Sequence, residues 1–570
     1  MASALTEFEQ AKTRYGEGCA EAKLALLGEL EGARLRSARA VVRLHDVLCF
    51  LRAYPDEARV LAQAERMLEG FHRRADLRRH RTALADSGIA GTAIRYRFFW
   101  PTLQWLARRW PRRLVLDRGD KEPPERIRAA LPLLVTEAER AWLKASGVSA
   151  FEALDRFRAR TETDAVFLAR RIAAMPGDTF TREAYSDAID AAYRLDPGTD
   201  TPSRTHARHA AAPAAFQKRP LRRNRPDLPE QIALAPRAVR ELSRREGERL
   251  IDLARGVMVT HARDLDAFAY GDPRDVRIVD DGEGLGFMVN GVVPERRPLV
   301  AGIYGYLTLH NGVPIGYGQL DLVGRTAAIA FNTFESFRGG EAAWTFARLL
   351  AMARHLFGST SFSLEPYQLG HRNAEGIASG AWWFYYKLGF RPQAAEPRRI
   401  LALELARMEA DANHRSDRAT LRRLAAWHVF FDLDRSRPAG PASEGELGLR
   451  VAGVLAARSG ADRERGLREC GREAMRLAGL RSLQGFSADE RRAWSRWGPL
   501  VVSLPGISRW TLAEKRALVH VIRAKGGRRD ADCVALFAAH PRLGPALFGD
   551  PGRGGHPSAR RGGPWAPAPE

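Results

Sequence analysis

The stretch from residue 276 to 334 constrains the fold most, because its apolar runs have the length and residue types of β-strands. These runs cover residues 276–279, 299–309, 313–323 and 327–334. Asn311 and Gly312 lie between two of them, and this dipeptide readily adopts the positive φ angles of a tight hairpin turn. The chain is therefore expected to contain a sheet and not to be an all-helical bundle.

The regions on either side of these strands have helical patterns. Val60, Ala64 and Met67 recur on one face of a predicted amphipathic helix. Further along, Ser487 and Thr511 each precede a glutamate by three residues, the spacing of a capping box at a helix start. We therefore expect an α+β protein, in which a central mixed-sheet domain lies between all-α N-terminal and C-terminal regions.

Changes in composition suggest where these regions meet. Residues 196–232 are rich in Pro, Thr, Ala, His and Arg, which favours a flexible basic linker. The C-terminal tail is rich in Gly, Pro and Arg, which favours disorder. The expected parts are a helical domain (1–195), the basic linker (196–232), the sheet domain (233–406), a helix and linker (407–446), a helical domain (447–548) and a disordered tail (549–570).

The chain is strongly basic, with 90 Lys and Arg against 68 Asp and Glu and a net charge of +22. Such a surplus attracts acidic partners such as nucleic acid, while a general bias towards arginine in the composition is the alternative explanation. We find no apolar run long enough to span a membrane, no signal peptide and no paired cysteines. These features predict a cytoplasmic protein without a membrane partner, a disulfide framework or a metal site.

One segment has the pattern of an anion site. The apolar run that ends at Phe334 leads into a loop with Arg338, Gly339 and Gly340, and a predicted helix begins near Ala342. Backbone N–H groups at a helix start attract phosphate, and Arg338 would add a charged hydrogen bond. An ordinary turn between a strand and a helix is the alternative.

A second segment follows this helix: Phe384-Tyr385-Tyr386-Lys387-Leu388-Gly389-Phe390. Together with the preceding loop it resembles the GCN5-related N-acetyltransferase (GNAT) superfamily, in which a motif of the form F-Y-x-K-x-G-F follows a phosphate-binding loop. Arg338 and Ala343 fit the loop motif, whereas Glu341 stands where the family has glycine. A carboxylate beside a pyrophosphate is repulsive, so the direction in which Glu341 points bears on binding.

The resemblance implies a GNAT-like domain at 233–406 that transfers an acyl group to an unidentified amine. Acetyl-CoA, or another acyl-CoA, would be the cosubstrate. Tyr385 would protonate the departing thiolate. From its position at the end of the predicted strand, Glu335 could act as the base for the amine, and a surface carboxylate is the alternative. The residues expected to hold the cosubstrate are Phe334, Arg338, Gly339, Gly340, Ala342 and Ala343.

Two alternatives remain open. Tyr385 is surrounded by aromatic residues in the sequence and could be a core residue instead of a catalyst. The whole domain could be a non-catalytic GNAT-like scaffold whose helical regions bind a protein or nucleic-acid partner.

Overall fold

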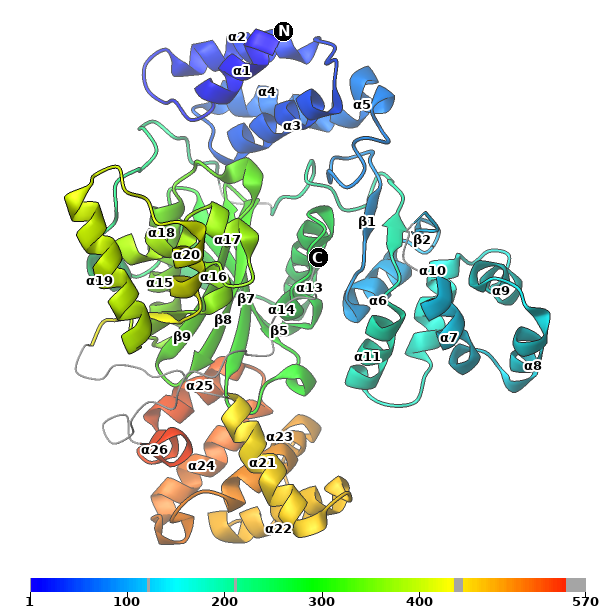
Figure 1. The fold of residues 1–570 in the computed structure, drawn as a ribbon, viewed down its shortest axis with the longest axis vertical. Helices are drawn as coiled ribbons and strands as arrows, with labels where there is room; N and C mark the ends of the chain where they lie inside the picture. The colour runs from blue at the N-terminus through cyan, green and yellow to red at the C-terminus, as the bar shows by residue number, and fades with distance from the viewer. Residues whose placement is uncertain (1, 120–123, 210–212, 435–443, 550–570) are drawn as a thin grey trace.

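The computed structural model describes residues 2–119, 124–209, 213–434 and 444–549, which combine helices with two β-sheets (Figure 1). Four parts follow one another along the chain. We refer to them as the N-terminal unit (2–79), the arm (94–195), the sheet unit (228–432) and the C-terminal unit (444–548).

The N-terminal unit consists of helices packed around an apolar core. Val60, Ala64 and Met67 are buried on one face of α4, which confirms the amphipathic helix predicted there. The helices are α1 (Ala2–Ala11), α2 (Cys19–Glu31), α3 (Ala38–Ala53), α4 (Ala58–Glu69) and α5 (Ala75–Arg79).

The arm differs from the expected all-α region because it contains a small antiparallel sheet of order β1-β3-β2. Leu195 of β3 pairs with Ile94 of β1 on one side and with Leu114 of β2 on the other. Strands of three residues are too short to show an alternating pattern, so this prediction was wrong. The elements are β1 (Ile94–Tyr96), α6 (Trp100–Arg109), β2 (Leu114–Leu116), α7 (Pro124–Leu134), α8 (Glu137–Ser146), α9 (Ala150–Phe157), α10 (Asp164–Ala173), α11 (Thr179–Ile189) and β3 (Tyr193–Leu195).

The described residues of the sheet unit form a nine-stranded sheet of order β11-β12-β10-β9-β8-β7-β6-β5-β4. Asn311 and Gly312, with φ of 50° and 75°, form the predicted hairpin turn between β7 and β8. The elements up to the end of β9 are α12 (Leu228–Ala233), β4 (Ala238–Glu241), α13 (Arg244–Thr260), α14 (Asp266–Ala269), β5 (Gly271–Gly282), β6 (Leu285–Val292), β7 (Gly302–His310), β8 (Val313–Val323) and β9 (Thr326–Thr333).

Beyond β9 the chain adds helices and the strands of the other sheet edge. The strand β12 lies beyond residue 406, where the sheet domain was expected to end, and it pairs with both β10 and β11. The elements are α15 (Ala342–Phe357), β10 (Ser361–Leu364), α16 (Pro366–Leu369), α17 (Ala374–Ala378), α18 (Ala381–Lys387), β11 (Arg391–Pro392), α19 (Ala395–Ala410), α20 (Arg418–Ala425) and β12 (Val429–Asp432).

Helices pack on both faces of this sheet because side chains alternate between the faces along each strand. On one face, Tyr306 and Leu320 share a core with Phe346 of α15. On the other face, Leu307 packs in a core that includes Ile251 of α13. The sheet is therefore the middle layer, with α15 on one side and α13 on the other (Figure 1).

The C-terminal unit is helical, as predicted. Ser487 with Glu490, and Thr511 with Glu514, form the two predicted capping boxes. The helices are α21 (Glu444–Ser459), α22 (Arg463–Ala478), α23 (Ala488–Val502), α24 (Leu512–Lys525), α25 (Asp530–Ala539) and α26 (Leu543–Phe548). The predicted tail lies outside the described residues, apart from Gly549.

The segment that we expected to be a flexible linker makes specific contacts in its described residues. Thr205 bonds the ring of His45 in α3, with 2.9 Å between oxygen and nitrogen. The N–H of His209 donates to the Gly312 carbonyl over 2.9 Å, and the N–H of Gln217 donates to Pro55 over 2.8 Å. The segment therefore runs between the N-terminal unit and the hairpin turn that joins β7 and β8.

Candidate functional site

The candidate site begins where two parallel strands part. β9 and β10 are paired through three residue pairs, and the last of these joins Ala328 to Ser363. Further along β9, the N–H of Phe331 donates to the side-chain oxygen of Gln368, 3.0 Å away, instead of to a strand. Beyond Ala328, the edge of β9 that faces β10 is therefore no longer paired with that strand, although β9 stays paired with β8 up to Thr333.

The loop after β9 leads to a helix start without a side-chain cap. A 3-10 turn (Glu335–Phe337) and the glycines 339 and 340 precede α15, and Gly339 has a φ of 100°, which favours glycine. Glu341 occupies the N-cap position of α15, and its side chain accepts no hydrogen bond from the helix. The first N–H groups of α15, including those of Ala342 and Ala343, therefore form a positive helix end suited to an anion.

Arg338 lies on the same loop, but its guanidinium group is engaged elsewhere. It forms an ion pair with Glu375 at the start of α17, although about half of the Arg338 side chain stays exposed. Arg263, which follows α13, lies 3.9 Å from the other oxygen of that carboxylate. A phosphate at the loop would have to compete with Glu375 for Arg338.

Glu341 points towards the segment 219–223, which crosses the loop. Its carboxylate accepts a hydrogen bond from the backbone N–H of Arg222 over 2.7 Å. The Arg222 guanidinium group lies 4.0 Å from the ring centre of Trp344 and pairs with Glu283 over 2.6 Å. Arg223 adds a contact of 3.4 Å to the Gly340 carbonyl oxygen. We refer to residues 219–223 as the strap.

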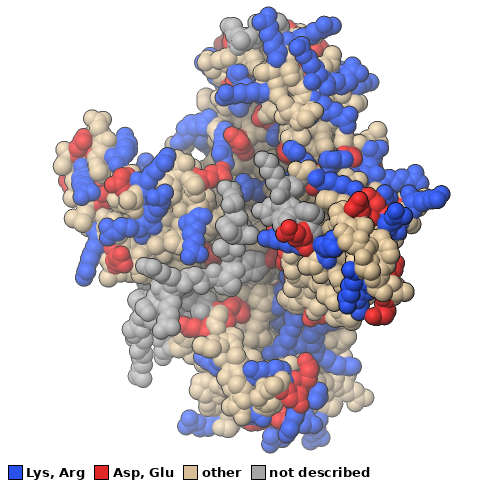
Figure 2. All heavy atoms as spheres, turned by 45° about the vertical axis from the view of Figure 1, so that its right-hand side comes forward, with Lys and Arg blue, Asp and Glu red and all other residues tan. Residues whose placement is uncertain are grey.

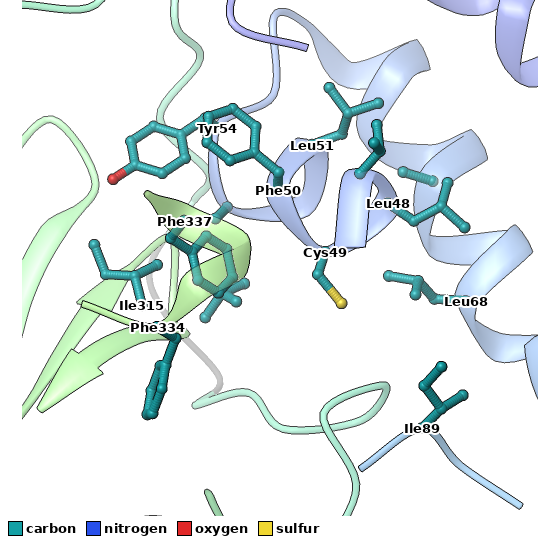
Figure 3. Packing of buried hydrophobic residues seen from close by; sticks show 14 of the residues in the cluster. Leu48, Cys49, Phe50, Leu51, Tyr54, Leu68, Ile89, Ile315, Phe334 and Phe337 are labelled. Carbon is teal, nitrogen blue, oxygen red and sulfur yellow. The ribbon is translucent and has the colours of Figure 1, made fainter. Parts of the chain in front are cut away.

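The N-terminal unit also packs against this loop. Phe50 of α3 stacks on Phe337 with 6.4 Å between ring centroids. A Cβ atom on Gly340 would lie only 3.2 Å from the Tyr54 hydroxyl oxygen. Figure 3 shows Phe50 and Tyr54 beside Phe337 and Ile315. The cavity among Tyr54, Ile315 and Phe337 has room for about one water molecule, so an extended ligand needs the strap or α3 to move.

The structure places Tyr385 in the core of the sheet unit. Its side chain on α18 is 4% exposed, and its ring lies 5.3 Å from that of Phe346 in α15. Burial raises the pKa of Tyr385 above its ordinary value. Burial also raises the pKa of Tyr306, and the nearby Tyr385 hydroxyl adds to that shift. The predicted acid is therefore close to the sheet, whereas Glu335, the predicted base, is exposed on the 3-10 turn.

One carboxylate that the sequence reasoning missed lies on β8. The side-chain amide of Gln319 donates to Asp321 over 2.8 Å. Burial raises the pKa of Asp321 to about 7, and the nearby Glu365 and Glu444 contribute in the same direction. Burial also raises the pKa of Glu365, which directly follows β10. A signal was available, because polar and apolar residues alternate from Gln319 to Leu322.

Asp321 belongs to a polar strip on the α13 side of the sheet. Residues on the α15 side of β8 and β9, such as Leu320 and Ile329, are buried. The residues that alternate with them along these strands, such as Gln319 and Asp321, are partly exposed. The strip is made of Tyr317, Gln319 and Asp321 on β8 and Ala328, Ala330 and Asn332 on β9. It runs towards the point at which β9 and β10 part.

Within the described part of the chain, no group of three or more His, Cys, Asp or Glu side chains is placed to hold a metal ion. None of the described helices is both long enough and apolar enough to cross a membrane. The chain matches no protein-family model, no curated protein and no solved structure with which it was compared.

Proposed function

We propose that the sheet unit is a GNAT-like N-acyltransferase that uses acetyl-CoA or another acyl-CoA. The observation that carries this proposal is the parting of β9 and β10 beside the uncapped start of α15. The helix start suits the pyrophosphate of the donor, and the edge of β9 that is not paired with β10 beyond Ala328 suits its amide-containing arm. Of the predicted loop residues, Arg338, Gly339, Gly340, Ala342 and Ala343 lie on the loop or in the first turn of α15. Phe334 directly follows β9, and its ring stacks on that of His261.

The reaction would be a direct transfer. The amine nitrogen bonds to the thioester carbonyl carbon, and the carbon–sulfur bond breaks to release a thiolate. Tyr385 is the proposed donor of a proton to that thiolate. The proton lost by the amine needs a base, for which Glu335 is a candidate because of its position just after β9.

Asp321 is better suited than Glu335 to act as this base. A base works best when its pKa lies near the working pH, and burial brings the pKa of Asp321 to about 7. Asp321 also lies on the polar strip, so an amine could approach from the α13 side while the donor occupies the loop. We therefore assign the amine acceptor to the polar strip.

Calorimetric titration of the full chain with acetyl-CoA tests the donor site. We expect dissociation constants on the order of micromolar to millimolar, weakened by Arg338→Ala. A sharper variant is Ala343→Glu, because an acidic residue in the first turn stabilises a helix but repels a phosphate there. Ala343→Gln is the matched control, since it adds the same bulk without the charge. Equal affinity in these two variants would contradict a phosphate site at α15.

Catalysis is tested separately by the release of free thiol from acetyl-CoA in the presence of candidate amines. Tyr385→Phe should lower the rate by roughly 10²-fold or more while acetyl-CoA binding is unchanged. If binding and the rate both stay the same, Tyr385 is only a core aromatic residue.

A non-catalytic scaffold is the second candidate, and the strap favours it. The contacts of Glu341 with Arg222 and of Tyr54 with Gly340 close the loop from two sides. A scaffold would bind no acetyl-CoA at millimolar concentration, even after Glu341→Ala removes the anchor of the strap. Binding of acetyl-CoA only after Glu341→Ala would indicate an enzyme whose donor site is closed by the strap, whereas no binding by either protein would indicate a scaffold.

A further inference from the structure

A group of exposed arginines lies on the N-terminal unit and on the residues that directly follow α5, in segments that make none of the contacts described above for the candidate site. They come from two segments, 32–40 between α2 and the first turn of α3, and 70–83 around α5. We call this group the arginine face, and its members are Arg34, Arg36, Arg39, Arg73, Arg78, Arg79 and Arg81, all exposed.

Arg74 and Asp76 tie the two segments together. The guanidinium group of Arg74 donates to the carbonyl oxygens of Glu31 and Ala33, at 3.0 and 2.6 Å. Arg74 also pairs with Asp76 over 2.8 Å, and Asp76 accepts the N–H of Leu35 over 3.0 Å. The arginine face is therefore one continuous surface on a fixed backbone.

The charge of this surface is strongly one-sided. Segments 32–40 and 70–83 contain eight arginines and one acidic residue, Asp76, which gives a net charge of +7. Arg74 neutralises Asp76, and among the described residues no ion pair joins the other seven arginines to an acidic side chain. Figure 2 shows blue side chains gathered over the upper end of the molecule, where the N-terminal unit lies.

A general bias towards arginine does not account for this segregation. On α22 of the C-terminal unit, exposed arginines are interleaved with Glu464, Glu469 and Glu473. Two ion pairs that involve this helix, Arg465 with Glu469 and Arg458 with Glu473, reduce its charge. In the arginine face the nearest exposed acidic residues in the sequence, Glu31 and Glu69, precede the two segments, and neither forms an ion pair with its arginines among the described residues.

The chemistry of the arginine face fits a chain of phosphates. The planar guanidinium group of arginine matches a phosphate through paired hydrogen bonds. Membranes and protein partners usually bind through large apolar side chains as well. Among the described residues, the large apolar side chains that are exposed begin at Phe99, beyond the N-terminal unit. We infer that the arginine face binds the phosphate backbone of nucleic acid without reading its sequence.

The test is fluorescence anisotropy of the full chain with a labelled DNA duplex and an RNA of mixed sequence, over a range of salt. If about five phosphates are contacted, the affinity should fall several-hundred-fold between roughly 50 and 200 mM salt. A quadruple variant removes four of these charges: Arg34→Ala, Arg36→Ala, Arg78→Ala and Arg79→Ala. It should bind weakly, and its slope of log affinity against log salt should be shallower by about 3.6.

The matched control is Arg463→Ala, Arg468→Ala, Arg472→Ala, Arg476→Ala on α22, which removes the same charge from another exposed surface. The inference predicts nearly unchanged binding for this control. Equal loss in both variants would show that net charge alone attracts the nucleic acid, and undiminished binding by the first variant would place the contact elsewhere. Equally tight binding to polyglutamate would exclude phosphate recognition. Each of these three results overturns the inference.

Discussion

The carboxylate of Glu341 accepts a hydrogen bond from the backbone N–H of Arg222, a residue 119 positions earlier in the chain. This contact holds the strap across the start of α15, where the resemblance to the GNAT superfamily predicts a phosphate. The Glu341 carboxylate therefore faces the strap, and it accepts no hydrogen bond from the first N–H groups of α15. Glu341, which departs from the GNAT loop motif, is thus held by a specific hydrogen bond from Arg222.

The first prediction concerns this contact. Glu341→Ala should raise the affinity for acetyl-CoA roughly tenfold, or about 1.4 kcal/mol, because it frees the strap and removes a negative charge beside the phosphate site. Titration calorimetry measures the change. Glu396→Ala on the exposed start of α19 removes the same charge at a distance and should leave the affinity unchanged. Weaker binding by Glu341→Ala would mean that Glu341 supports the site.

The second prediction concerns the base. Because burial raises the pKa of Asp321 to about 7, its carboxylate form accumulates as the pH rises through 7, and the acyl-transfer rate should rise with it. Asp321→Asn should lower the rate by roughly 10² to 10⁴ and abolish this rise. The rate is followed by thiol release between pH 5.5 and about 8.5.

Gln319→Leu provides a further check on Asp321. The hydrogen bond from Gln319 stabilises the carboxylate, so its loss should move the rise of the rate to higher pH. A purely structural role of Asp321 would leave the pH of this rise unchanged.

The third prediction concerns the joint between the arm and the sheet unit. Asp264, after α13, accepts the N–H of Phe99 over 2.9 Å and the hydroxyl of Thr102 over 2.7 Å, and so joins the sheet unit to the start of α6. Burial raises the pKa of Asp264 to about 7, so the folded state binds this proton more tightly than the unfolded state does. The free energy of unfolding of the wild type should therefore fall, relative to Asp264→Asn, as pH rises from about 4 to 7.

Urea unfolding at pH 5 and pH 8 measures this difference. Asp155→Asn is the control, because the hydrogen bond from Arg118 lowers the pKa of Asp155 to about 2. Its effect on stability should be the same at both pH values. A pH-independent effect of Asp264→Asn would contradict the raised pKa.

The sequence predicts the elements that have a local pattern. The apolar run from 313 to 323 predicts β8, and the Asn311-Gly312 dipeptide predicts the hairpin that the structure contains. The strands β1, β2 and β3 have no such signal, because each has three residues and pairs with a segment far away in the sequence.

The candidate site shows the same limit. The loop and helix start can be predicted from the strand, the glycines and the apolar face that follow one another in the sequence. The partners of its charged residues cannot, because Glu375 and Arg222 reach Arg338 and Glu341 only through the tertiary fold. Whether Arg338 is available to a ligand therefore depends on contacts that no motif contains.

The last prediction concerns the attachment of the C-terminal unit. The Arg297 side chain is buried and donates to the carbonyl oxygens of Lys525, Gly527 and Arg528 at the end of α24, over 2.7 to 3.1 Å. It also lies 3.6 Å from the buried Asp272. Arg297→Ala leaves these acceptors without a donor, so it should lower the free energy of unfolding by roughly 3 to 5 kcal/mol. Urea unfolding measures this loss, and limited proteolysis should show earlier cleavage in residues 444–548. Arg491→Ala, at an exposed position on α23, should change stability by less than about 0.5 kcal/mol. A similarly small effect of Arg297→Ala would mean that apolar packing alone holds the C-terminal unit to the sheet.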